Sequence, residues 1–189
     1  MQLENTQYRF GLVAQTIHWL VFVAFVAMFI VAEIMMDMKD SPTKWQLYAL
    51  HKSTGIVILF VVFFRIYWRM LNPTPVLPAH MRRVEKMLAH LSHFLLYMVM
   101  LLMPLSGYIM SMAGGHGITV YGMWEMPNFV GLDKDMSKIA HTTHHWTATI
   151  IYYLVGLHAF AALWHHFVKK DSILHRMLPV VKNPEETKK

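Results

Sequence analysis

The sequence predicts an all-α integral membrane protein, a four-helix bundle that forms a single domain over residues 1–189. Of its 189 residues, 56% are hydrophobic and 15% are charged, whereas a soluble domain carries about 25% charged residues. The mean hydropathy is +0.36. Four apolar runs reach the roughly 20 residues that a membrane-spanning helix needs, and turn-forming residues separate them. These observations together indicate a chain whose surface faces lipid.

The first two apolar runs predict helices at about 14–36 and 47–70. Few basic residues precede the first run and no small-residue cleavage site follows it, so we expect a retained span rather than a removed signal peptide. Pro42 is expected to end the first helix. The stretch 72–75, which reads Asn-Pro-Thr-Pro, and Pro78 are expected to end the second.

The last two runs predict helices at about 87–112 and 139–168. The stretch 114–117, which reads Gly-Gly-His-Gly, is expected to end the third helix. The connection at 113–138 contains Tyr121, Trp124 and Phe129. Because such aromatic side chains favour the headgroup boundary, we expect this connection to lie on the membrane surface.

The distribution of basic residues predicts the orientation. Four spans place both termini on one side, and twelve of the 17 Lys and Arg lie on that side, including Lys182, Lys188 and Lys189. Cytoplasmic loops retain positive charge, so we expect both termini in the cytoplasm. The net charge of +6 then reflects topology, and no nucleic-acid partner is expected.

Histidine is the residue type that indicates function. The chain has 13 His and no Cys, which excludes thiolate metal sites, iron–sulfur clusters and c-type haem attachment. Ionisable side chains are costly inside a membrane and often mark functional sites. Two His on facing helices can clamp a haem iron from both sides.

Depth along the predicted helices selects two His pairs. His144 and His158 on the fourth helix are 14 residues apart, which is about 21 Å of rise on nearly one face. His144 matches the outer depth of His51, and His158 matches the inner depth of His18. The sequence therefore predicts axial pairs His51/His144 and His18/His158, and two such sites would suit electron transfer across the membrane.

Other histidines compete for these positions. His141 and His145 point about 100° and 140° away from the face of His158. His93 remains a reserve ligand, or a residue that bonds a propionate or quinone. Taken singly, a His near a helix end is most simply an interfacial residue, and that is our interpretation of the following set: His80, His116, His165, His166 and His175.

Two basic residues lie beside the predicted pairs. Arg65 follows His51 by 14 residues, so it is expected on the same face at the inner depth, where its guanidinium could pair with a haem propionate. Lys52 adjoins His51 and could supply a local positive charge. Gly55, Gly107 and Gly156 could allow a haem or a helix to approach closely.

Short motifs along almost the whole chain carry a resemblance to a known family. The first are Ile-His-Trp-Leu at 17–20, His-Lys-Ser-Thr-Gly at 51–55, Arg-Ile-Tyr-Trp-Arg at 65–69 and Asn-Pro-Thr-Pro at 72–75. The later ones are Ala-His-Leu-Ser-His at 89–93, Pro-Leu-Ser-Gly-Tyr at 104–108, Val-Tyr-Gly at 120–122, Gly-Leu-His-Ala at 156–159, His-His-Phe at 165–167 and Leu-His-Arg-Met at 174–177. With these motifs the chain resembles the bacterial cytochrome b561 family.

The resemblance implies a four-helix membrane protein with two b-type haems, whose axial positions fall on His18, His51, His144 and His158. It also implies a quinone-linked oxidoreductase, in one branch a superoxide oxidase that passes electrons to ubiquinone. Two alternatives remain open. The chain is also similar to membrane subunits that carry electrons for a partner hydrogenase or formate dehydrogenase, and a haem-free, His-rich metal transporter is the less favoured reading. No catalytic residue is assigned.

Overall fold

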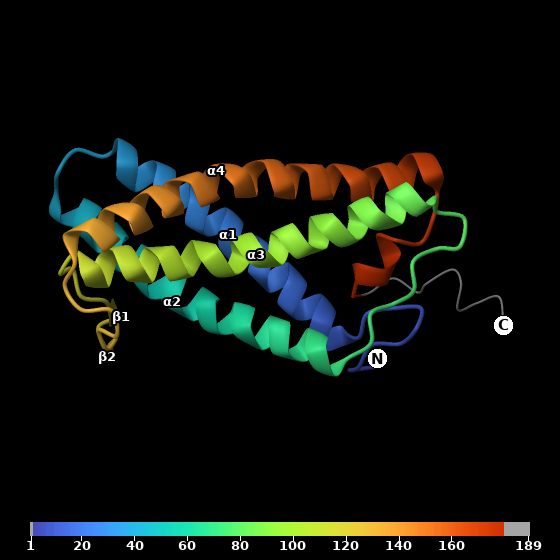
Figure 1. Cartoon of the computed structure of the whole chain (residues 1–189), viewed down its shortest axis with the longest axis horizontal. Helices are drawn as coiled ribbons and strands as arrows, with labels where there is room; N and C mark the ends of the chain where they lie inside the picture. Colours follow the sequence, from blue (N-terminus) through green and yellow to red (C-terminus); the bar gives the residue numbers. More distant parts are fainter. Residues whose placement is uncertain (1, 180–189) are drawn as a thin grey trace. The chain divides into compact units, whose positions relative to one another are not determined.

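The computed structural model describes residues 2–179 of the chain, so Lys182, Lys188 and Lys189 of the charge argument lie outside it. Four long helices account for most of the described residues: α1 (Leu12–Asp37), α2 (Pro42–Leu71), α3 (Arg83–Ala113) and α4 (Lys134–Trp164). Figure 1 shows them in chain order from blue to orange. All four are long and apolar enough to cross a membrane. The predicted all-α membrane fold is confirmed.

Two of the helices, α2 and α4, begin several residues before the apolar runs that predicted them, because their first turns are polar. Pro42 does not end the first helix, which stops at Asp37, but is the first residue of α2. This position suits proline because its missing N–H needs no partner there. Asp133 Oδ1 accepts the backbone N–H groups of Asp135 and Met136, each at 2.9 Å, and caps α4. Both helices thus start with a polar turn.

A small hairpin, absent from the predicted elements, interrupts the 113–138 connection. Strands β1 (Thr119–Val120) and β2 (Trp124–Glu125) pair antiparallel. Tyr121 and Gly122 turn the chain with φ of 49° and 73°, the left-handed region in which Gly is the least strained residue.

The end of α4 is also irregular. A π-helical turn (His165–Lys169) continues it, and Lys170 then adopts a left-handed φ of 53°. A short 3₁₀ helix (His175–Met177) follows. The chain therefore turns back directly after the last span.

The described residues form two compact units, each containing a part of every long helix. The terminal unit comprises residues 2–20, 64–98 and 150–179. The loop unit comprises residues 21–63 and 99–149, and so includes the hairpin. Every contact described below lies inside one unit.

Each unit has a compact centre, while many large apolar side chains lie on the outside of the helices. In the loop unit, the buried cluster consists of Ile56, Tyr108, Met112 and Ile118. In the terminal unit, Gln15 is 2% exposed, and its side-chain amide donates to the Phe10 and Arg176 carbonyls. Large apolar residues such as Tyr153 are exposed on the helices. Exposed apolar surface on spanning helices is the surface that lipid covers.

Candidate functional site

The loop unit brings His51 of α2 and His144 of α4 together. Their ring centres are 6.4 Å apart and the ring planes cross at 75°. A metal–imidazole bond is about 2.0 Å and the ring centre lies about 1.2 Å behind the nitrogen, so two imidazoles on opposite sides of one metal have centres about 6.4 Å apart. The pair therefore has the spacing that a shared haem iron requires.

Hydrogen bonding also prepares His144 to bind a metal. Its Nδ1 lies 3.0 Å from the Met103 carbonyl oxygen and 3.2 Å from Ser106 Oγ. Because a carbonyl only accepts, Nδ1 carries the proton, and Nε2 keeps its lone pair free for a metal. The Nδ1 atom of His51 is buried and has no partner within residues 2–179.

Gly107 of α3 lies against the His144 ring. A Cβ atom at this position would be 3.1 Å from His144 Cε1 and 3.3 Å from Nδ1. Because glycine has no side chain, the His144 imidazole can occupy the space beside residue 107. The sequence identified Gly107 as a position of close approach, and the structure shows which group approaches it.

The three residues after His51 hold the hairpin. Lys52 Nζ donates to the Gly117 carbonyl at 2.9 Å. Ser53 Oγ accepts the Tyr121 backbone N–H at 3.1 Å, and Thr54 Oγ1 lies 3.0 Å from the Tyr121 hydroxyl. The ammonium of Lys52 is therefore engaged with backbone carbonyls of the loop.

The terminal unit contains the other pair. The ring centres of His18 (α1) and His158 (α4) are 6.3 Å apart, with an interplanar angle of 62°. His93 of α3 is closer to His158, at 5.5 Å, which is about 0.9 Å too short for a metal bonded to both rings. The pair His18/His158 thus matches the spacing for an iron better than the reserve candidate does.

Arg65 of α2 lies directly beside this pair. Its Nη2 is 3.0 Å from His18 Nδ1, and its guanidinium is 5.5 Å from the centre of the Tyr97 ring. Arg65 Nε is buried without a hydrogen-bond partner. None of the ion pairs among residues 2–179 includes Arg65. A buried guanidinium without an acid fits an anionic group such as a haem propionate.

The same contact shows what haem binding would change. A guanidinium only donates, so His18 Nδ1 accepts from Arg65 and the ring proton lies on Nε2. An imidazole that ligates iron through Nε2 must carry its proton on Nδ1 instead. Binding of a haem would therefore require Arg65 to leave His18, and a propionate is the acceptor it would then need.

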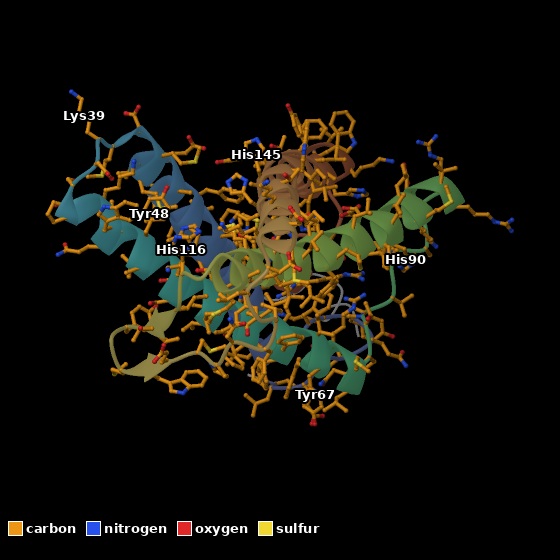
Figure 2. The ribbon with its side chains drawn as sticks, turned by 60° about the vertical axis from the view of Figure 1, so that its left-hand side comes forward. Lys39, Tyr48, Tyr67, His90, His116 and His145 are labelled. Carbon is orange, nitrogen blue, oxygen red and sulfur yellow. The ribbon has the colours of Figure 1, made fainter. Side chains whose placement is uncertain are left out.

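The remaining histidines lie elsewhere. The side chains of His141 and His145 are exposed, as are those of His80, His90 and His116; His90, His116 and His145 are labelled in Figure 2. His166 packs on His175 with ring centres 4.9 Å apart.

No group of three or more His, Cys, Asp or Glu residues within 2–179 is arranged to hold a metal ion. A haem needs only two side-chain ligands, because the porphyrin supplies the other four. The residues present therefore fit haem and give no support to a metal transporter.

Comparison with known proteins agrees with this chemistry. The family model for prokaryotic cytochrome b561 matches residues 9–180. Cytochrome b561 homolog 2 of Escherichia coli is 32% identical over 94% of this chain and 95% of its own length. A probable superoxide oxidase of Yersinia pestis is 31% identical over 86% of this chain and 92% of its own. Cytochrome b561 homolog 1 of E. coli is 32% identical over 75% of this chain and 80% of its own. The chain, with four membrane-spanning helices and histidines facing one another in pairs, belongs to the prokaryotic cytochrome b561 family.

Proposed function

We propose that this protein is a dihaem cytochrome that oxidises superoxide on the outer side of the bacterial inner membrane and reduces ubiquinone. Family membership makes it a haem b-binding membrane protein of electron transfer. Beyond family membership, we propose the number of haems, the electron donor, the electron acceptor and the orientation in the membrane.

The observation that carries the proposal is the spacing of the two His pairs. Ring centres at 6.3 and 6.4 Å are both close to the separation of about 6.4 Å worked out above for two imidazoles on one metal. Each pair lies inside one compact unit. We assign one haem to His18 and His158, and the other to His51 and His144.

A bound haem b supplies one-electron redox chemistry, and with two His ligands it has no open position for oxygen. The chain's own residues hold and tune that group. His144 is oriented by the Met103 carbonyl. In the terminal unit, Arg65 would neutralise a propionate.

Superoxide is proposed as the donor because a relative that covers most of the chain is named a probable superoxide oxidase. Ubiquinone is proposed as the acceptor, since a one-electron donor in a membrane needs a lipid-soluble acceptor. Two superoxide ions give two O₂ and two electrons, and one quinone takes these electrons with two protons to form quinol. We place both termini in the cytoplasm on the count of basic residues.

The test is anaerobic reduced-minus-oxidised spectroscopy with haem quantitation on the purified protein. A superoxide source and then a soluble quinone are added in the same cuvette. Two haems that superoxide reduces and quinone reoxidises would support the proposal. Two haems indifferent to superoxide would indicate a carrier fed by a partner dehydrogenase or hydrogenase. A protein without haem would overturn the haem assignment.

A further inference from the structure

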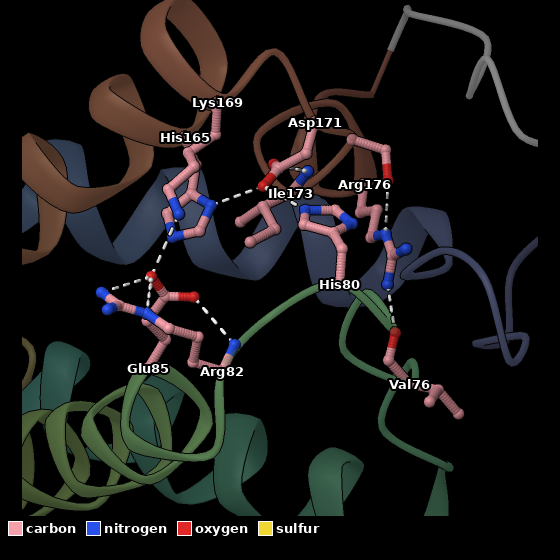
Figure 3. A network of polar contacts seen from close by, with 10 residues as sticks. Val76, His80, Arg82, Glu85, His165, Lys169, Asp171, Ile173 and Arg176 are labelled. Carbon is pink, nitrogen blue, oxygen red and sulfur yellow. Dashed lines mark hydrogen bonds and ion pairs between the residues drawn. The ribbon is translucent and has the colours of Figure 1, made fainter.

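A polar cluster in the terminal unit lies outside the His pairs and has no role in the function proposed above. Asp171 Oδ2 is 2.5 Å from His165 Nδ1 and 3.5 Å from His80 Nε2. Figure 3 shows Asp171 between the two imidazoles. The cluster joins two parts of the chain that are far apart in the sequence. His80 lies in the turn after α2, and His165 lies at the end of α4.

The three side chains differ in their access to solvent. The His80 side chain is 56% exposed, whereas those of Asp171 and His165 are 4% and 14% exposed. An almost fully buried carboxylate therefore connects an exposed imidazole to a buried one. Chains of Asp, Glu and His in membrane proteins commonly carry protons.

The local backbone builds this contact. The π-helical turn and the left-handed Lys170 bring Asp171 back under the helix end, where its N–H donates to the His165 carbonyl at 3.1 Å. Asp171 Oδ1 accepts the Ile173 N–H, also at 3.1 Å. The carboxylate is thereby held with its second oxygen against His165.

The charged groups Glu85 and Arg176 near the cluster have partners outside it. Glu85 of α3 forms ion pairs with Lys169 at 3.1 Å and with Arg82 at 3.2 Å. Arg176 donates to the Ser172 hydroxyl and to the Val76 carbonyl.

Among residues 2–179, the ion-pair partners of Asp171 are histidines alone. Histidine gains and loses its proton near neutral pH, whereas Lys and Arg stay charged. The cluster therefore places a carboxylate oxygen between two imidazole nitrogens, whereas the neighbouring Glu85 carboxylate is held between Lys169 and Arg82.

We propose that His80, Asp171 and His165 form a proton relay that supplies quinone reduction in the terminal unit. The relay rests on the proposed function, in which each quinone takes two electrons and two protons. A proton from water binds His80, which approaches Asp171 across the 3.5 Å contact and passes the proton to Asp171 Oδ2. His165 then carries its own proton on Nε2, and it accepts the Asp171 proton at Nδ1 while Nε2 releases its proton to a quinone oxygen. Exchange of the remaining ring proton from Nδ1 to Nε2 through water readies His165 for the second proton. His165 lies seven residues from His158 in the same unit, which is about 10 Å along the helix.

The test compares two acceptors on the full-length, haem-loaded protein. The haems are first reduced with a chemical reductant, and their reoxidation is followed by stopped flow after mixing with a soluble ubiquinone analogue. A parallel measurement uses ferricyanide, which accepts electrons without protons. Loss of a group that transfers protons commonly costs about 10²–10⁴ in rate. We expect Asp171→Asn and His165→Gln to slow the quinone reaction by at least about tenfold and to leave the ferricyanide reaction unchanged.

Glu85→Gln is the matched control, because it removes a carboxylate from the adjacent ion-pair group without touching the relay, and its quinone rate should be normal. His80→Gln changes an exposed residue and should fold even where Asp171→Asn does not. Its quinone rate should fall and should recover when imidazole is added as a mobile proton donor.

Three outcomes would overturn the relay: quinone rates equal to the wild type in Asp171→Asn and His165→Gln, equal slowing with ferricyanide, or equal slowing in Glu85→Gln. For His80→Gln, a normal quinone rate or a slow one that imidazole fails to restore would also count against it. A wild-type protein whose reduced haems ignore quinone, while ferricyanide oxidises them, would overturn the proposed function and the relay together. If the wild type does reduce quinone but the variants are not slowed as predicted, the relay alone is overturned and the proposed function stands.

Discussion

Substitution of Gly107 by alanine tests the haem proposed for the loop unit. The new Cβ would stand 3.1 Å from His144 Cε1, whereas carbon atoms in contact prefer about 3.5–4.0 Å. The imidazole must therefore move by about 0.4–0.9 Å. Metal–ligand distances hold only to about ±0.2 Å, so a shift of this size is too large for the bond to iron. We expect Gly107→Ala to lose one of the two haems.

The sign of the stability change separates this effect from simple misfolding. Alanine in a helix interior is more favourable than glycine by roughly 0.5–1 kcal/mol, so the helix itself gains from the change. The haem-free variant should unfold no more readily than the haem-free parent. Loss of haem with unchanged or increased helix stability is the expected combination.

The assay is haem content per protein by pyridine haemochrome, together with the reduced spectrum. Gly117→Ala is the matched control in the same unit, because its added Cβ would meet only Glu125 Oε1 at 3.8 Å, an ordinary contact. It should keep both haems. Two haems and an unchanged spectrum in Gly107→Ala would refute the placement of an iron on His144.

Three further predictions concern the two His pairs and the hairpin. His51→Ala and His158→Ala should each leave one haem, a different one in each variant, while His93→Ala keeps both; retention of two haems in either of the first two variants would contradict the pairing. Arg65→Met should lower the midpoint potential of one haem and weaken its binding, because a buried positive charge is lost, and redox titration should find Arg65→Lys nearer to the parent. Ser53→Ala leaves a backbone N–H of the hairpin unsatisfied, at a cost of about 1–3 kcal/mol, and should speed hydrogen exchange there; equal exchange in both proteins would show that the hydroxyl does not hold the hairpin.

Several properties of this protein were readable from local sequence patterns. The four spans follow from apolar runs, because a span depends on the composition of one continuous segment. The two pairs of facing histidines also followed from helix geometry, since depth and face are periodic in residue number. The structure brings together His51 with His144 and His18 with His158. Ligation of haem by these residues stays a prediction.

The helix ends and the surroundings of the pairs were less predictable. The polar first turns of α2 and α4 are not part of an apolar run, so hydropathy placed both starts too late. The motif at 104–108 was visible as part of the family resemblance, and Gly107 was noted as a position of close approach. That its backbone lies against His144 depends on how two helices meet. Arg65 was expected to face a propionate, but its contact with His18 Nδ1 was not expected.

The sequence by itself determined the membrane fold, the number of spans and which histidines share a depth, because each of these follows from composition or periodicity within single helices. Only the tertiary structure decided the ring separations, the tautomer of His144 and the hairpin held by residues 52–54. It also decided the grouping of His80 with Asp171 and His165. From the sequence, His80 and His165 were expected to be separate interfacial residues, and Asp171 was not singled out. These features join segments distant in the chain, and their geometry depends on packing and turn conformations that no local pattern encodes.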